Sequence, residues 1–100
     1  MSEINTAAFF GAVLKAVACT PNHNDDRAEY AEGVLAPVAR IREFEKEVGG
    51  RPLTSAEAEQ VLSWLDMVLR TKRTSREDLE HHHRQIVRAA GTELPMGVLA

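Results

Sequence analysis

The sequence predicts an all-α protein, a compact bundle of four to five helices in a single domain over residues 1–100. Apolar residues recur at helical spacing along most of the chain, and turn-forming residues separate the periodic segments. No segment alternates apolar and polar residues as a half-buried strand would. A chain of 100 residues can build one modest hydrophobic core, so these helices are expected to share it.

The clearest helix is expected over residues 55–72. Thr54 and Glu57 have the spacing of a capping box, in which each side chain satisfies a backbone N–H at the helix start. The face expected in the core consists of Ala58, Val61, Leu62, Leu65, Val68 and Leu69. The face expected in solvent consists of Glu59, Ser63, Asp66 and Arg70. Trp64 and Met67 lie on a flank between the two faces and need an apolar neighbour, in this chain or in another protein.

A first helix is expected over residues 6–19, with Asn5 or Thr6 as its cap. Its bulky face consists of Phe10, Val13, Leu14 and Val17, and its thin face of Ala8, Gly11, Ala12 and Lys15. Close packing of a second helix on the thin face could offset the cost of about 1 kcal/mol that an interior glycine carries. Cys19 is the only cysteine, which excludes an internal disulfide, and a buried, inert thiol is expected.

Two further helices are expected over residues 26–36 and 37–48. Asn24, Asp25 or Asp26 caps the first of them, and Asp26 with Glu29 has capping-box spacing. Gly49 with Gly50 ends the pattern. Pro37 interrupts the segment, yet the apolar pattern keeps its phase across it, so the chain forms either two closely phased helices or one kinked helix. The apolar face consists of Ala31, Val34, Leu35, Val38, Ile41 and Val48, with Phe44 or Glu45 between them.

A last helix is expected over residues 75–90, because Thr74 and Glu77 repeat the capping-box spacing and Gly91 stops the pattern. Its inner stripe consists of Leu79, His83, Ile86, Val87 and Ala90. Residues 92–100 form an apolar tail without helical phase, which either covers one end of the core, contacts a partner or stays loose.

No catalytic, cofactor or metal motif is present, so a non-enzymatic protein without cofactors is expected. The chain has neither a Gly-x-Ser-x-Gly turn nor a Gly-rich phosphate loop. His81, His82 and His83 point about 100° apart on a helix and cannot converge on one ion. We expect His83 to be half buried and His81 and His82 to be solvated. The loop cluster of His23, Asp25 and Asp26 matches neither a calcium loop nor a zinc site.

A basic segment over residues 70–88 suggests one possible function. It contains Arg70, Lys72, Arg73, Arg76, Arg84 and Arg88. Two helices joined by a short polar turn have the outline of a helix-turn-helix, which would make the protein a small DNA-binding regulator or antitoxin. Against this alternative, Glu77, Asp78 and Glu80 would face the phosphates from the start of the recognition helix.

The acidic part of the chain suggests a different partner. Residues 25–47 carry seven acidic and four basic side chains, whereas the net charge of the whole protein is −3. An acidic face can compete with nucleic acid for the basic surface of a nucleic-acid-binding protein. The residues expected to bind this protein partner are Asp25, Asp26, Glu29, Tyr30, Trp64 and Met67, while the oligomeric state stays open.

Three stretches carry a family resemblance: Met1-Ser2-Glu3-Ile4-Asn5, the acidic loop from Asn22 to Asp26, and Glu80 to Gln85. Taken over its full length, the chain resembles the small phage-encoded anti-CRISPR inhibitors that act on type I surveillance complexes. The members of this group share no motif, so no functional residue is carried over. The resemblance implies a compact domain that sits on subunits of a Cascade-like complex and blocks recognition of target DNA.

The first helix does not predict a membrane or secreted protein. The apolar run from Ala7 to Cys19 is shorter than the roughly 20 residues needed to span a bilayer. Glu3 is the only charge before Lys15, so the basic start of a secretory signal is missing. We therefore expect a cytosolic protein, and the resemblance to phage-encoded inhibitors implies the cytoplasm of the host cell.

Overall fold

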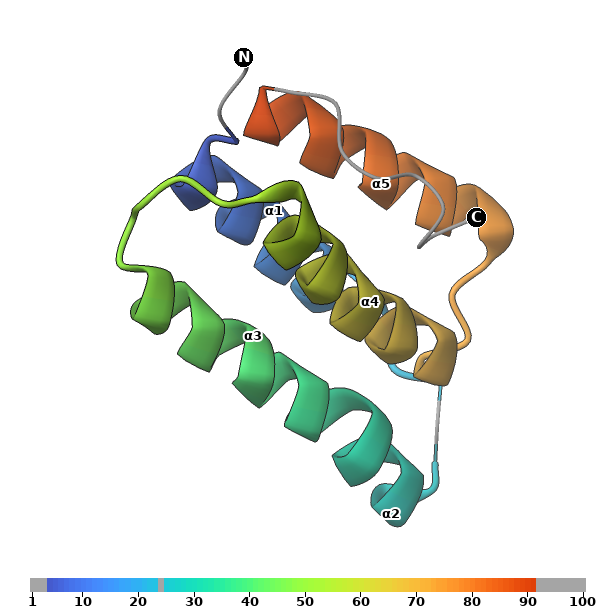
Figure 1. Cartoon of the computed structure of the whole chain (residues 1–100). Helices are drawn as coiled ribbons and strands as arrows, with labels where there is room; N and C mark the ends of the chain where they lie inside the picture. Colours follow the sequence, from blue (N-terminus) through green and yellow to red (C-terminus); the bar gives the residue numbers. More distant parts are fainter. Residues whose placement is uncertain (1–3, 24, 92–100) are drawn as a thin grey trace.

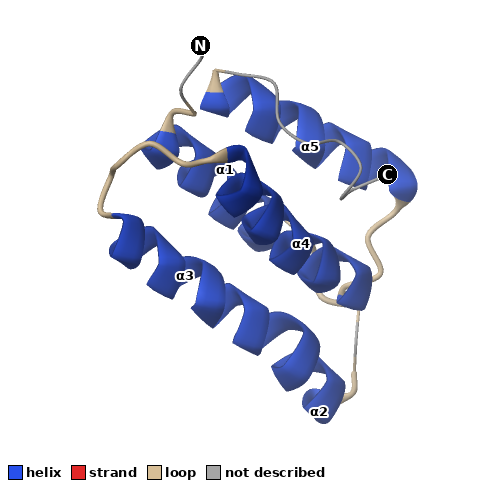
Figure 2. Cartoon of the chain, in the orientation of Figure 1, coloured by secondary structure: helices blue, strands red, loops and turns tan. Residues whose placement is uncertain are grey.

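The computed structural model describes residues 4–23 and 25–91, and this part of the chain forms four helical rods (Figures 1 and 2). The rods are α1 (Thr6–Cys19), a continuous rod made of α2 (Arg27–Tyr30), η1 (Ala31–Leu35) and α3 (Ala36–Val48), then α4 (Ser55–Thr71) and α5 (Arg76–Ala90). The only pairing of extended backbone among the described residues is an isolated bridge between Ile4 and Leu53. The predicted all-α class is confirmed, and the described residues form four rods where four to five helices were expected. The tail 92–100 lies outside the described residues.

The rods pack in the order α5, α1, α4, α3, so that α1 and α4 lie between the two outer rods (Figure 1). The face of α4 predicted to lie in the core is buried over its whole length. On α1 the buried set differs from the bulky face expected: Phe9 and Ala16 are buried with Phe10 and Val13, whereas Leu14 and Val17 are half-buried. The inner residues of all four rods form one hydrophobic cluster.

A chain of aromatic rings crosses this cluster. Phe9 and Phe10 on α1 meet edge to face with 5.5 Å between ring centroids. Phe10 in turn meets Phe44 of α3 at 6.2 Å, and Phe44 meets Trp64 of α4 at 6.1 Å. Such pairs contribute about 0.5–1.5 kcal/mol each beyond the area they bury. Trp64 therefore finds its apolar neighbour within this chain.

The rod of α2, η1 and α3 passes Pro37 without a break. Proline has no N–H to donate, and its ring would clash with the carbonyl four residues earlier, which belongs to Gly33. The turn before Pro37 is a π-helix, in which the Ala36 N–H bonds to the Ala31 carbonyl five residues back. This wider turn makes room for the proline ring. Of the two arrangements expected, two closely phased helices or one kinked helix, the chain forms a single continuous rod.

Leu35 and Asp66 lie on faces that the helical pattern did not assign to them. Leu35 was expected in the core and has 54% of its surface exposed, because the π-turn shifts the phase of the residues around it. Asp66 was expected in solvent, but its side chain is only 16% exposed and pairs with Arg70 at 2.8 Å. The last capping box is also wrong by one residue: Ser75 rather than Thr74 caps α5, accepting from the Asp78 N–H.

Two helical glycines have opposite surroundings. A Cβ on Gly33 would lie 2.9 Å from Cβ of Thr71 and closer still to the other two side-chain atoms, so η1 and α4 pack here at a distance that only glycine permits. A Cβ on Gly11 would meet no atom of the described residues within 4 Å. The close approach that the sequence suggested for Gly11 is thus found at Gly33.

We expect Gly33→Ala and Gly11→Ala to change stability in opposite directions. Gly33→Ala should lower the free energy of unfolding by about 1–3 kcal/mol, the usual cost of overpacking. Gly11→Ala should raise it by up to about 1 kcal/mol, because alanine is the better helix former and has room. Urea denaturation of both variants measures the difference. A shift of the same sign in both would contradict the packing described for η1 and α4.

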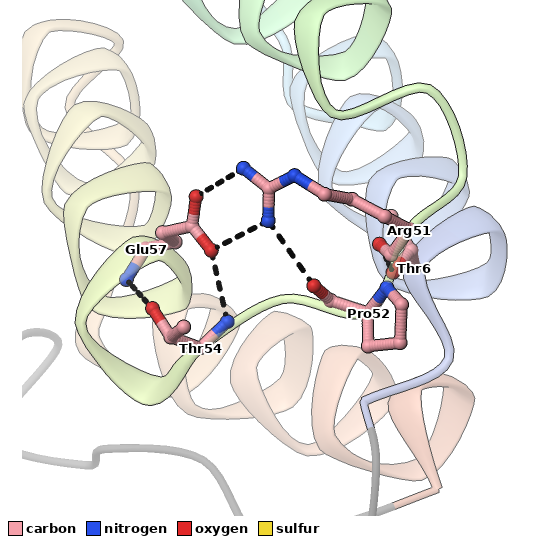
Figure 3. A network of polar contacts seen from close by, with 5 residues as sticks. All are labelled: Thr6, Arg51, Pro52, Thr54 and Glu57. Atoms are coloured by element: carbon pink, nitrogen blue, oxygen red, sulfur yellow. Dashed lines mark hydrogen bonds and ion pairs between the residues drawn. The ribbon is translucent and has the colours of Figure 1, made fainter.

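A polar network connects the start of α4 and the loop before it to the start of α1 (Figure 3). The Arg51 guanidinium donates two hydrogen bonds to the Glu57 carboxylate, at 2.9 and 2.6 Å. Glu57 also accepts from the Thr54 N–H, and the Thr54 hydroxyl accepts from the Glu57 N–H, which completes the predicted capping box. The Thr6 hydroxyl donates to the Arg51 carbonyl at 2.7 Å, and the Asn5 N–H donates to the Ala90 carbonyl at 2.9 Å.

This network predicts a specific dependence of stability on pH. The hydrogen bonds from Arg51, followed by that from the Thr54 backbone, lower the pKa of Glu57 from 4.5 to about 2. A carboxyl whose pKa is lower in the folded state stabilises fully above its unfolded pKa, and this contribution disappears as the pH falls towards the folded value. Glu57→Gln should therefore lower the melting temperature at pH 6, with a difference from the wild type that shrinks towards pH 2. A difference that is the same at every pH would refute the ionic role of Glu57.

Candidate functional site

The acidic loop and helix start that the sequence proposed as a binding surface are exposed. Asp25, Asp26 and Glu29 all face solvent, at the end of α2 that Figure 1 places far from α5. Asp26 caps the helix, because its carboxylate accepts from the N–H groups of Ala28 and Glu29 at 2.9 and 3.2 Å. The cap uses one carboxylate of the three. Asp25 and the Glu29 side chain make no hydrogen bond or ion pair with described residues.

Of the three apolar members of the proposed surface, Tyr30 adjoins this acidic group, whereas Trp64 and Met67 lie on α4 and do not join it in one patch. Tyr30 follows Glu29 directly and is half-buried, so part of it is open to a partner. Trp64 is half-buried against Phe44. The rod that carries the acidic group meets α4 at Thr71, where Gly33 packs. Trp64 is seven residues before Thr71, which places it about 10 Å away along the axis of α4 at 1.5 Å per residue. Met67 is the exposed member of the flank, with 47% of its surface in solvent.

Within the basic segment, the position of Lys72 differs most from the sequence prediction. The sequence pattern groups it with exposed cations, but only 6% of its surface is exposed. Its ammonium donates to the carbonyls of Val17 and Thr20, at 2.7 and 2.9 Å. These carbonyls lie at the end of α1, where the helix dipole favours a cation. Burial lowers the pKa of the Lys72 ammonium. Lys72 therefore joins the ends of α4 and α1 and is not available to a nucleic acid.

The rest of the basic segment is exposed but partly paired. Arg70 pairs with Asp66, and Arg76 pairs with Glu80 at 3.4 Å. The helix that would read DNA in a helix-turn-helix, α5, packs mainly against α1 rather than against α4 (Figure 1). The segment therefore presents fewer free cations than its sequence suggests.

The three histidines have three different environments. His81 is exposed as expected, whereas His83 is fully rather than half buried, with 3% of its surface exposed. His82 was expected in solvent and is instead half-buried, with Nε2 at 3.2 Å from the Thr20 hydroxyl. That hydroxyl donates its proton to the Ala16 carbonyl at 2.7 Å, so it accepts from His82, whose Nε2 carries the hydrogen. Burial and the charge of His81 lower the pKa of His82, partly countered by Asp78.

Cys19 is exposed, which corrects the expected buried thiol. It lies on the wall of a groove of about 550 Å³ between α1 and α5, together with His81 and His82. Sequence reasoning missed this groove, because the thin face of α1 was expected to be covered by another helix. Among the described residues, no three His, Cys, Asp or Glu side chains are placed to hold a metal ion together.

Comparison with known proteins adds no relative: no family model, curated protein or solved structure matches the chain. No helix within residues 4–23 and 25–91 is long and apolar enough to cross a membrane. No site residue can therefore be transferred from a relative, and the two candidate surfaces, the acidic start of α2 and the groove between α1 and α5, rest on the structure of this chain alone.

Proposed function

We propose that this protein is a non-enzymatic interaction module, an inhibitor that uses the acidic start of α2 to occupy a basic surface on a nucleic-acid-binding protein. The observation that carries the proposal is the excess of exposed carboxylates at this end of the molecule. Asp26 alone serves the helix cap, whereas Asp25 and the Glu29 carboxylate have no hydrogen-bonding or ionic partner among the described residues. Carboxylates held in this way can take the place of phosphates on arginine and lysine side chains.

The burial of the Lys72 side chain supports this proposal over the DNA-binding alternative. With Lys72 buried and Arg70 and Arg76 paired, the basic segment has lost part of the charge that phosphate binding requires. Asp25 and Glu29, in contrast, form no ion pair with a described residue. A small regulator or antitoxin that uses residues 70–88 is therefore the alternative outcome of the test, not a second proposal.

The class of partner follows from the resemblance to anti-CRISPR inhibitors. On this proposal the basic surface belongs to a type I CRISPR surveillance complex in the host-cell cytoplasm, and the bound protein prevents the complex from recognising target DNA. Tyr30 would contribute aromatic contact area beside the carboxylates, and Met67 with Trp64 would form a separate apolar contact on α4.

The test replaces the acidic charges without removing the helix cap. In the variant Asp25→Lys with Asp26→Asn, asparagine still caps the helix, since it is as good an N-cap as aspartate. Inhibition of target-DNA binding by a purified surveillance complex, followed by electrophoretic shift, should weaken about 100-fold, equivalent to about 2.7 kcal/mol. Inhibition by the wild type should also weaken as salt is raised.

A matched control makes the same charge change elsewhere. Glu45→Lys with Glu47→Gln alters the net charge equally on two exposed residues near the end of α3, and it should leave inhibition nearly unchanged. Full inhibition by the folded Asp25 and Asp26 variant would reject the proposal. Loss of function on Arg73→Glu with Arg76→Glu, together with tight binding of the protein alone to duplex DNA, would establish the regulator instead.

A further inference from the structure

Three segments of the chain meet at Thr20, the residue that follows α1. Thr20 is buried, and both of its oxygens accept hydrogen bonds from distant residues. The carbonyl accepts from the Lys72 ammonium at the end of α4, at 2.9 Å. The hydroxyl gives its own proton to the Ala16 carbonyl, so it accepts from Nε2 of His82 on α5, at 3.2 Å. One residue thus joins the ends of α1 and α4 to α5 (Figure 1).

The two ends of the α1–α5 pair differ in how they respond to pH. The helices are antiparallel, since Asn5 bonds to Ala90 at one end and Thr20 bonds to His82 at the other. The Asn5–Ala90 bond joins backbone groups, which do not titrate between pH 5 and 8. Histidine is the side chain whose charge changes in that range. Acid can therefore act on the Thr20 end of the pair and leave the Asn5 end intact.

A second positive charge at Thr20 is unfavourable. The end of α1 favours a cation, and the Lys72 ammonium already occupies it, bonded to the carbonyls of Val17 and Thr20. Protonation of His82 would place another cation on the hydroxyl of the same Thr20, within a half-buried contact. Loss of solvent and the nearness of a like charge both disfavour the protonated ring.

The ionisable side chains around this junction come from all three helices: His81 and Asp78 from α5, Lys15 and Cys19 from α1, and Lys72 from the end of α4. His81 meets His82 edge to face, with 5.8 Å between ring centroids. Burial, followed by the charge of His81, lowers the pKa of His82 below its ordinary value of 6.5, and Asp78 counters this in part. Lys15 lines the same groove as His82 and adds a further cation.

The lowered pKa gives the direction of the effect of acid. In the unfolded chain His82 takes up a proton near pH 6.5, whereas in the folded chain it does so at a lower pH. Such a group supports the folded state above its unfolded pKa, and this support is lost as the pH falls through the folded pKa. Acidification below pH 6.5 therefore weakens the junction at Thr20.

We propose that Thr20, Lys72 and His82 form an acid-sensitive latch, which opens when His82 gains a proton and frees the first half of α5 from the end of α1. The proton comes from solvent and binds Nδ1, since Nε2 already carries a hydrogen. The Asn5–Ala90 end of the pair stays closed and acts as the hinge. The latch does not rest on the proposed function, because stability and local opening of the chain by itself are measured.

The first test uses His82→Gln, which removes the titration but keeps a side-chain N–H that can donate to the Thr20 hydroxyl. Melting temperatures are compared at pH 7.5 and 5.5, a range in which the Glu57 carboxyl, with an ordinary pKa of 4.5, stays ionised. Over this range the wild type should lose at least about 2 °C more than His82→Gln. The matched control is His23→Gln, at an exposed histidine in the loop after α1, and it should respond as the wild type does.

Amide hydrogen exchange locates the opening. At pH 5.5 the amides of residues 79–83 should be at least about twofold less protected in the wild type than in His82→Gln, which corresponds to the expected shift in melting temperature. They should also be less protected than those of residues 86–90, next to the hinge. Thr20→Val removes the hydroxyl and keeps the carbonyl that Lys72 binds. At pH 7.5 this variant should protect residues 79–83 no better than the wild type does at pH 5.5.

Three outcomes would overturn the latch. If the wild type and His82→Gln lose the same stability on acidification, the response belongs to another group. Equal protection of residues 79–83 and 86–90 at pH 5.5 would mean that α5 opens only as a whole. Full protection in Thr20→Val at pH 7.5 would show that the hydroxyl does not hold α5 to α1.

Discussion

Leu65→Ala should lower the free energy of unfolding by about 2–5 kcal/mol, the range found when a large core side chain is truncated. Leu65 is completely buried in the middle of α4, the helix that lies between α3 and α1. Close packing on both sides limits how far the surroundings can collapse into the cavity, which favours the upper part of this range. Urea denaturation followed by circular dichroism measures the change.

The control for Leu65→Ala is Asp66→Ala, a truncation of the next residue in the same helix. Asp66 forms an i,i+4 ion pair with Arg70, a kind of contact that contributes about 0.3–0.5 kcal/mol. Its other oxygen is buried without a hydrogen-bond partner among the described residues, so removing the carboxylate also removes an unfavourable group. The expected change is within about 0.5 kcal/mol. Equal denaturation midpoints for the two variants would mean that α4 faces the other way.

Lys72→Met is expected to have the second large effect, a loss of about 2–4 kcal/mol. Methionine keeps the apolar stem of the side chain but cannot donate to the carbonyls of Val17 and Thr20. These carbonyls would then lose a charged donor at the end of α1. Arg73→Ala, at an exposed neighbour, should change stability by no more than about 0.5 kcal/mol. A harmless Lys72→Met would show that Lys72 does not hold α1 and α4 together.

Local signals predicted the helices well because their causes are local. Asn5, Thr54 and Asp26 cap their helices through side-chain bonds that span two or three residues, and such bonds can be read from spacing alone. The π-turn at Ala31–Leu35 could not be read in this way. Pro37 indicated that the helix is irregular at this point. A widened turn and a break between two helices, however, leave the same apolar pattern in the sequence.

The environments of Lys72, His82 and Cys19 could not be predicted, because each depends on contacts between segments distant in sequence. Lys72 meets residues 55 and 52 positions away, and His82 meets one 62 positions away. A helical pattern assigns a residue to a face but does not say which other rod covers that face. The thin face of α1 contains the groove for the same reason, since α5 packs beside it and does not cover it.

The placement of α1 determines when this protein can fold during synthesis. Its main neighbour is α5, the last of the described helices in chain order, and the Asn5–Ala90 hydrogen bond joins residues near the two ends of the described chain. A ribosome adds about 5–20 residues per second, so the apolar α1 emerges seconds before its partner. Until α5 leaves the exit tunnel, the nascent chain cannot complete its core. Chaperones that bind exposed apolar helices have their best opportunity in the interval between the emergence of α1 and that of α5.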